Sequence, residues 1–314
     1  MDQFKKSSAN KIINCVLAIA IVISLLGIGT DFTNTMRHGG TDLRNRVVGA
    51  RLISKGIDPY FYRWRPGDPE TLRDPFDNPE LPMSRVTVSP IGLAFYAPFA
   101  NLSYRRQRWI WFALQQLAMF GSLAFLIFAN KHQRNKAILA ISLLFINSGF
   151  FWRHHVETGQ IYIFFVFLIS IFYWFLSQKR RFKNELAGLA LGLAIAIRPP
   201  LIAMTLPLLL FQKIRLFSTT ILSTAAWLLL SVLLYGYQVW INYFSAMSII
   251  SKLSRGEIKI SPIKDIVLPP FLEGVTFSLI DASPTYESSW SLRLYKILGF
   301  NPGVGQIIVI LSVF

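Results

Sequence analysis

Asp42 is the acidic residue of this chain best placed to act as a general base. It follows the first long apolar run and stands at the start of a segment with helical hydrophobic spacing. A helix dipole favours an ionised carboxylate in the first turn, and an ionised carboxylate can accept the proton of an attacking hydroxyl group. The same position also suits a structural acid that only complements the dipole, so the local pattern leaves both roles open.

Arg198 is the residue best suited to bind a phosphate group. It precedes Pro199 and Pro200 and follows a segment rich in alanine and glycine. The planar guanidinium group of arginine can donate two parallel hydrogen bonds to phosphate oxygens. The alternative is an arginine at a helix end that extends its charge towards the membrane surface.

A further polar group stands at the junction of two apolar segments and consists of Arg153, His154, His155, Glu157 and Gln160. Charge next to a membrane span is costly and calls for an explanation. A solvated turn between helices is one explanation, and positive charge aimed at a substrate phosphate is another. The His-His-x-Glu spacing is a weak match to a metal site. No cofactor is expected, and a requirement for a divalent metal stays open.

The composition indicates a membrane protein. Of the 314 residues, 53% are hydrophobic and 15% are charged, and the mean hydropathy is +0.45. Apolar runs near the ~18-residue length of a membrane span recur along the chain. The formal charge of +16 fits basic turns that meet anionic lipid, and no motif supports a nucleic-acid partner. Cys15 is the one cysteine, so there is no intrachain disulfide.

The first third of the chain predicts one span followed by a polar loop. Residues 12–29 predict an uncleaved first span with its N-terminus inside. Residues 30–85 form the loop and hold half of the acids. Thr41 is a plausible N-cap of a helix that ends at Gly56 and Pro59. Four apolar residues share one face of this helix, which predicts an amphipathic helix on the membrane surface: Leu43, Val47, Ala50 and Ile53. Residues 65–82 predict an irregular loop that orders on substrate binding.

The remaining chain predicts further spans and a second polar loop. Apolar segments that suit spans lie at 109–130, 137–152, 161–177 and 216–235. Residues 185–197 are small and apolar, which suits close helix packing, and 201–211 continue apolar. Residues 236–302 form the second loop. The last apolar run, 304–314, is too short to span a membrane, which predicts that the final spans are missing from this chain.

The distribution of basic residues predicts the orientation in the membrane. Lysine and arginine concentrate in the turns 131–136, 179–183 and 213–215, and such turns normally face the cytoplasm. Asp42, Arg198 and residues 154–160 then face the outside, together with the second loop. This arrangement requires 86–102, which contains Pro90 and Pro98, to be a re-entrant or surface segment. If that segment were instead a full span, the basic turns would lie outside, so we favour the first arrangement.

The order of these motifs resembles glycosyltransferase family 87, whose members are membrane-embedded enzymes of the GT-C type. Gly40–Asp42, the helix and then Gly56–Tyr60 are similar to the family's acidic residue, helix and Gly-Asp-Pro-Tyr turn. Ser89–Phe99 is similar to its proline-rich second segment, and Gly159–Gln160 and Arg198–Pro200 follow in the family's order. The resemblance covers residues 12–235. The helix after Asp42 lacks the family's usual tyrosines, and Ser89–Pro90 replaces a more common Pro-Pro pair.

The resemblance implies one all-α, polytopic domain over 1–314 with a GT-C-like helical bundle. It implies inverting transfer of a sugar, mannose in particular, from a polyprenyl phosphate to a lipid or glycan acceptor at the outer face of the plasma membrane. Asp42 would be the base, and Arg198 with His154 and His155 would hold the donor phosphate, with Arg44 and Arg46 as alternates. Further residues would line the substrate cavity: Asp58, Tyr60, Glu157 and Gln160. Membrane lipids are the expected surroundings.

Two other classes remain compatible with these patterns. A lipid or glycolipid transporter or flippase would also place arginine and histidine at span junctions, although no internal repeat is evident and the large polar first loop fits an acceptor cavity better. An inactive GT-C relative that acts in assembly is the second alternative.

Overall fold

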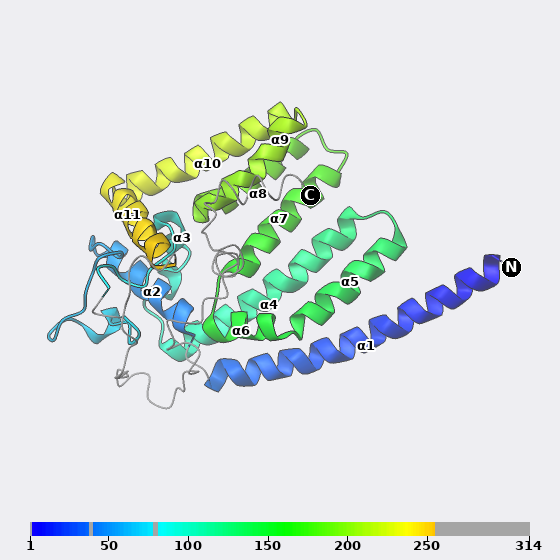
Figure 1. Cartoon of the computed structure of the whole chain (residues 1–314), viewed down its shortest axis with the longest axis horizontal. Coiled ribbons are helices and arrows are strands. Elements are labelled where there is room, and N and C mark those ends of the chain that lie inside the picture. Colours follow the sequence, from blue (N-terminus) through cyan, green and yellow to red (C-terminus); the bar gives the residue numbers. More distant parts are fainter. Residues whose placement is uncertain (1, 38–39, 78–80, 255–314) are drawn as a thin grey trace, which may run out of the picture.

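The computed structural model describes residues 2–37, 40–77 and 81–254, which form helices and connecting segments without a β-strand (Figure 1). This confirms the all-α prediction for the described part of the chain. The elements in chain order are α1 (Asp2–Arg37), α2 (Thr41–Ser54), η1 (Glu70–Leu72), α3 (Pro90–Ala94), η2 (Ala97–Phe99), α4 (Tyr104–Ala129), α5 (Gln133–Asn147), α6 (Phe150–Thr158), α7 (Tyr162–Ser177), α8 (Lys183–Ile197), η3 (Pro199–Thr205), α9 (Leu206–Leu210), α10 (Ile214–Tyr235) and α11 (Tyr237–Ser254).

Three described helices are long and apolar enough to cross a membrane: Lys11–Thr35 within α1, all of α4, and all of α10. The chain is therefore a membrane protein with several spans. The span expected at 137–152 is instead broken into α5 and α6, whose axes differ by 58°. The break falls at Ser148 and Gly149, where Gly149 is extended and begins α6.

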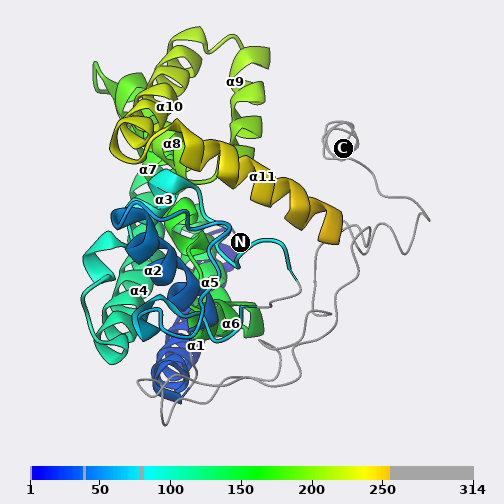
Figure 2. The ribbon, with the colours of Figure 1, turned by 90° about the vertical axis from the view of Figure 1, so that its left-hand side faces the viewer.

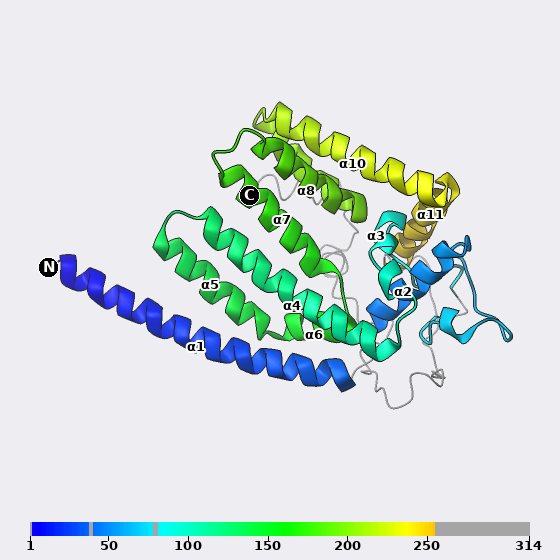
Figure 3. The same ribbon diagram turned by 180° about the vertical axis from the view of Figure 1, so that it is seen from behind.

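The helices pack side by side, and their turns separate into two ends (Figures 1 and 3). Helix α4 packs against α7, α7 against α8, α8 against α10, and α1 against α5. The N-terminus and the turns that follow α4, α7 and α9 lie at one end. Helices α2, α3 and α6 gather at the other end, where α11 runs from the end of α10 past α3 (Figure 2). The basic turns 131–136, 179–183 and 213–215 therefore share the end opposite α2.

Small residues allow α8 and α10 to approach closely, as their composition predicted. A Cβ atom on Gly192 would lie 2.6 Å from the Ser223 side chain, and one on Gly188 would lie 2.4 Å from Thr219 Oγ1. Close approach of this kind is typical of helices packed in a bilayer. It fixes the axis of α8, and so it fixes the position of Arg198 at the end of that helix.

Helix α2 differs from the amphipathic surface helix expected from the sequence. Eleven of its fourteen residues are buried, because the first loop folds back over the face that would otherwise meet solvent, with Leu72 packed on Val48 and Leu52. The N-cap is Gly40, with φ 42°, rather than Thr41. The expected end is confirmed: Gly56 has φ 72°, and the Gly56 and Ile57 N–H groups donate to carbonyls in the last helical turn.

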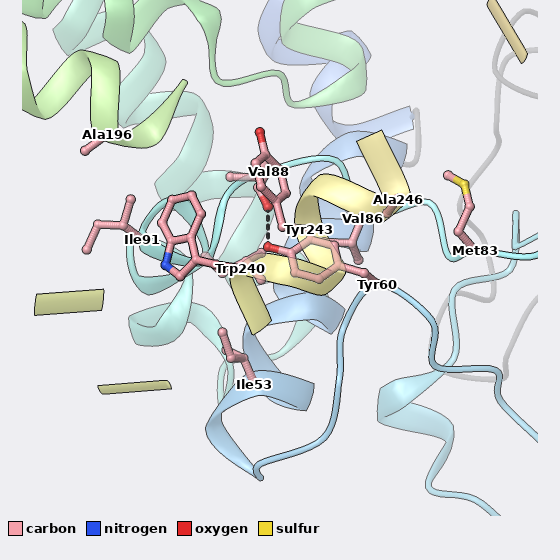
Figure 4. Close-up of a cluster of buried hydrophobic side chains, with 11 residues drawn as sticks. Ile53, Tyr60, Met83, Val86, Val88, Ile91, Ala196, Trp240, Tyr243 and Ala246 are labelled. Atoms are coloured by element: carbon pink, nitrogen blue, oxygen red, sulfur yellow. Dashed lines mark hydrogen bonds between the residues drawn. The ribbon is translucent and has the colours of Figure 1, made fainter. Parts of the chain in front are cut away.

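Of two further segments, residues 86–102 agree with the favoured expectation of a segment that is not a full span, whereas the second polar loop departs from expectation at its start. Residues 86–102 hold only α3 and η2, of five and three residues, so no continuous helix spans the membrane there. The start of the expected second polar loop is helix α11, while residues 255–302 of that loop and the run 304–314 lie outside the described residues. Aromatic and small side chains of α11 pack on the first loop: Trp240, Tyr243 and Ala246 join Tyr60, Val86 and Val88 in one buried cluster (Figure 4).

Candidate active site

Asp42 stands in the first turn of α2 and pairs with Arg46 one turn later. The distance from Asp42 Oδ2 to Arg46 Nη2 is 3.5 Å, and the side chains are 25% and 4% exposed, respectively. Arg46 Nη1 also donates a hydrogen bond of 3.2 Å to the Gly159 carbonyl oxygen. Burial has the largest single effect on the pKa of Arg46 and lowers it, but Asp42, Tyr96 and Tyr162 together outweigh burial and raise the pKa above its usual value. The carboxylate is thus held by a buried cation and keeps one partly open side.

The Gly159 turn joins α6 to α7 directly beneath this pair. Gly159 has φ 72° and ends α6 in the left-handed region. A Cβ atom there would lie 2.7 Å from Leu43 Cβ and 3.3 Å from Arg108 Nη1, so both the backbone and the packing require glycine. Gln160, the next residue, is tied through its carbonyl oxygen, which accepts a 2.9 Å bond from Gln115 Nε2. Helix α2 therefore packs against the turn formed by Gly159 and Gln160.

His155, on α6, lies near the Asp42–Arg46 pair. Its ring is 9% exposed and stacks on Trp152, with the ring centroids 5.3 Å apart and an interplanar angle of 13°. The Trp152 indole donates a 2.8 Å bond to Asp31 Oδ2 on α1, which fixes the stack. The charges of Arg46 and Asp42 both act on the His155 ring. Its Nε2 atom is buried and has no hydrogen-bond partner among the described residues, and the Gln160 side chain also acts on the ring.

Tyr162 connects His155 to Arg198 and was not singled out from the sequence. Its ring centroid lies 6.3 Å from that of His155 and 5.7 Å from the Arg198 guanidinium carbon. The ring is 43% exposed, and its phenol group acts electrostatically on Arg46. In the sequence Tyr162 stands two residues after the Gly-Gln motif, which by itself assigns it no role. His155 and Arg198 thus both lie against the Tyr162 ring, which also acts on Arg46, the partner of Asp42.

The end of α8 is held in register by the segment around Pro90. The Ser89 hydroxyl lies 3.1 Å from the Ala196 carbonyl oxygen and 2.9 Å from that of Ile197, and donates to them. The next residue is Arg198, after which the chain enters η3. The two proline-containing motifs of the sequence therefore meet, and the first fixes the backbone from which the arginine extends.

Other predicted site residues lie elsewhere. Arg44 lies under the first loop, where its Nη2 donates a 2.7 Å bond to the Arg73 carbonyl and burial lowers its pKa to about 10. Positions 42 and 44 project from different sides of a helix, so Arg44 does not join Asp42. Asp58 accepts a bond from the Tyr60 amide in a turn, and burial raises its pKa. His154 is half-buried on α6.

Tyr60, which the sequence predicted to line the substrate cavity, lies in a buried cluster. Its side chain is 0% exposed, and its hydroxyl donates a 2.8 Å bond to the Val88 carbonyl oxygen (Figure 4). Burial raises its pKa well above the usual value.

The Glu157 carboxylate accepts a bond from the Asn34 side-chain amide, which ties α6 to α1. Within the described residues no three His, Cys, Asp or Glu side chains gather at a possible metal site.

The Gly159 turn yields a prediction about stability. Gly159→Ala should lower the thermal unfolding temperature more than Gly56→Ala, measured on protein purified in detergent. Both residues have φ 72°, so each alanine variant should lose ~1–2 kcal/mol of stability, because alanine is strained in the left-handed region. A Cβ at Gly56 would meet nothing within 4 Å, whereas at Gly159 it should cost a further ~1–3 kcal/mol by overpacking. Equal decreases in unfolding temperature would show that close packing of α2 against this turn does not contribute to stability.

Comparison with known proteins identifies the family. The family model described as glycosyltransferase family 87 matches residues 87–262, which is more than half of the chain. The match includes the Ser89–Pro90, Gly159–Gln160 and Arg198–Pro200 motifs, whereas Asp42 precedes it. No curated protein and no solved structure matches the chain. The matched length shows that the chain belongs to glycosyltransferase family 87 and is a glycosyltransferase.

Proposed function

We propose that this protein is an inverting glycosyltransferase that moves a sugar, mannose in particular, from a polyprenyl-phosphate donor to a hydroxyl group of a lipid or glycan acceptor. The observation that carries the proposal is the grouping of one partly open carboxylate with two cationic side chains of different roles. Asp42 pairs with Arg46, and Arg198 lies across the Tyr162 ring outside that pair.

The reaction is a single displacement at the anomeric carbon. The acceptor oxygen forms a bond to that carbon as the bond from the carbon to the phosphate oxygen breaks, and the phosphate leaves with the electron pair. Asp42 accepts the proton of the acceptor hydroxyl in the transition state. Attack opposite the leaving group inverts the anomeric configuration.

The departing phosphate requires positive charge and hydrogen-bond donors. Arg198 can supply a planar fork of donors, and the Tyr162 ring under its guanidinium group holds that fork in place. His155, whose ring lies 6.3 Å from the Tyr162 ring, and the half-buried His154 are assigned to the same phosphate-binding region. Arg46 is almost fully buried, and its Nη atoms face Asp42 and the Gly159 carbonyl, so we assign it to positioning Asp42 rather than to the phosphate.

We further propose that the protein lies in the plasma membrane with its N-terminus in the cytoplasm and its site at the outer face. The basic turns share the end of the bundle opposite α2 (Figure 1), and the positive-inside rule directs that end to the cytoplasm. The prenyl tail of the donor would then stay in the bilayer while its sugar phosphate reaches the corner formed by α2, α6 and α8.

This orientation can be tested with cysteines introduced at two exposed serines, Ser103 and Ser177, after Cys15, itself exposed, is changed to serine. An impermeant thiol reagent applied to intact cells should label position 103 and leave position 177 protected, because 177 adjoins the basic turn at 179–183. The reverse labelling pattern would place the active site in the cytoplasm.

The role of Arg198 predicts a graded effect on donor use. Arg198→Ala should raise the donor KM by roughly tenfold or more, and Arg198→Lys should recover only part of this loss, because lysine keeps the charge without the bidentate geometry. The assay measures transfer of label from a radiolabelled polyprenyl-phosphate sugar in membranes. Unchanged kinetics in Arg198→Ala would return this residue to the role of a helix-end cation.

Asp42→Asn is the most direct test of the mechanism. The amide keeps the shape of the side chain but cannot accept the proton, so turnover should fall by roughly 10²-fold or more with little change in donor KM. Expression should stay near normal, because one charge near a helix N-terminus contributes at most ~1 kcal/mol.

Asp58→Asn is the comparison for this experiment, because Asp58 caps a turn and should affect stability before turnover. If the Asp42→Asn protein keeps substantial turnover, Asp42 is not the base. If the variant protein is missing from the membrane, Asp42 has a structural role, and the assignment as the base also fails. Lipid movement without sugar transfer in the wild-type protein would instead favour a flippase, and the absence of both activities would favour an inactive relative.

A further inference from the structure

Arg108 differs from the other arginines in the basic run at the start of α4. Arg105 and Arg106 are exposed, as expected for a basic segment at a membrane surface. Arg108 is 3% exposed, although burying a guanidinium group is costly unless the protein satisfies it. Its contacts therefore point to a specific task.

The Arg108 guanidinium group joins the carboxyl ends of two helices. Its Nη2 atom donates to the Glu157 carbonyl oxygen at 3.1 Å and to the Thr35 carbonyl oxygen at 3.4 Å. Glu157 lies in the last turn of α6, and Thr35 lies in the last turn of α1. Carbonyl groups in a last turn lack partners within their own helix and carry the negative end of its dipole, so a cation there is favourable.

The same guanidinium group abuts the start of α2. A Cβ atom on Gly40, the N-cap of α2, would lie 2.4 Å from Arg108 Nη1 and 2.8 Å from its Cδ and Cζ atoms. On the other side, a Cβ atom on Gly159 would lie 3.3 Å from Nη1. Both glycines have positive φ angles, 42° and 72°. The arginine therefore fills the space between the backbone that begins α2 and the backbone that ends α6.

We propose that Arg108 is a positioning residue for glycosyl transfer, which sets the start of α2 and thereby the place of Asp42 relative to the donor. The inference rests on the proposed role of Asp42 as the base. Arg108 acts through Gly40 and Gly159 and contacts neither substrate. Gly40 precedes Asp42 by two residues, and its carbonyl oxygen accepts the first bond of α2 from the Arg44 amide at 2.9 Å, so a shift of Gly40 moves the carboxylate directly.

A positioning role predicts a loss in the chemical step with donor binding intact. A misplacement of ~1 Å can lower a rate by ~10²-fold, whereas the phosphate is bound by Arg198 on another helix. Arg108→Lys should reduce kcat by roughly tenfold, since an ammonium group cannot fill the space between both glycines and reach both carbonyls. Arg108→Ala should reduce it further. The donor KM should stay within about threefold in both variants, in contrast to the rise expected for Arg198→Ala.

The measurement uses full-length protein in membranes with radiolabelled polyprenyl-phosphate mannose, and the unfolding temperature of each variant is recorded in detergent. Arg105→Ala is the matched control, because it removes the same side chain from the exposed side of the same turn and should leave kcat unchanged. Well-folded Arg108 variants with wild-type kcat would overturn the inference. A rise in donor KM with unchanged kcat would also overturn it, since Arg108 would then act on the substrate.

Gly40→Ala provides a second route if Arg108→Ala fails to fold. The added methyl group displaces the guanidinium group, so kcat should fall while Arg108 remains present. In a protein that already carries Arg108→Ala or Arg108→Lys, adding Gly40→Ala should lower kcat by a smaller factor than it does in the wild-type protein. The reason is that the clash with the guanidinium group is then removed or reduced. A well-folded Gly40→Ala protein with wild-type kcat would reject the inference.

Failure of this inference can be told apart from failure of the proposed function. If Asp42→Asn keeps its turnover, the assignment of the base is wrong, whatever the Arg108 variants do. If Asp42→Asn loses its turnover while folded Arg108 variants keep theirs, only the positioning role is wrong.

Discussion

Two buried arginines that bind backbone carbonyl groups hold together the end of the bundle on which the site depends. Arg46 binds the Gly159 carbonyl and Asp42, and Arg108 binds carbonyls in the last turns of α1 and α6. Helix ends near a membrane leave polar groups that the bilayer cannot satisfy, and a buried guanidinium group is costly without partners. The carbonyl groups at the helix ends therefore gain hydrogen-bond donors, and the buried guanidinium groups gain acceptors. Because the partners come from α1, α2, α4 and α6, one set of contacts fixes four helices and places Asp42 among them.

A second constraint fixes the other half of the site. The glycines of α8 allow α10 to pack closely, which sets the axis of α8, and Ser89 binds the last carbonyls before Arg198. Arg198 is then held by backbone geometry on one side and by the Tyr162 ring on the other. The proposed base and the proposed phosphate ligand thus lie on separate elements of the fold. Their separation can change only if the packing of α2 against the Gly159 turn or of α8 against α3 changes.

Most of the fold could be predicted from the sequence because apolar length and small-residue composition report directly on spans and their packing. The exceptions have physical causes. The apolar face of α2 marks burial but cannot show that the first loop also covers its polar face. The break between α5 and α6 follows from Ser148 and Gly149, which interrupt an otherwise apolar run. Helix α11 had a detectable pattern, with Trp240, Tyr243, Met247 and Ile250 at helical spacing, but its polar residues suggested a loop. Tyr162 and Arg108 could not be assigned, because their importance lies in contacts between distant segments.

The distribution of charge within the site supports the proposed use of a carboxylate beside an anionic substrate. An unpaired carboxylate close to a phosphate would repel the donor, and an unpaired buried arginine would be costly. Arg46 meets both difficulties, since it faces Asp42 from the protein interior, balances its charge at 3.5 Å and leaves the outer side of the carboxylate open. Arg198 is not part of that ion pair and lies instead against the Tyr162 ring. In the proposed mechanism one cation therefore serves the base and another remains for the phosphate, which is the division of charge that inverting transfer from a lipid phosphate would require.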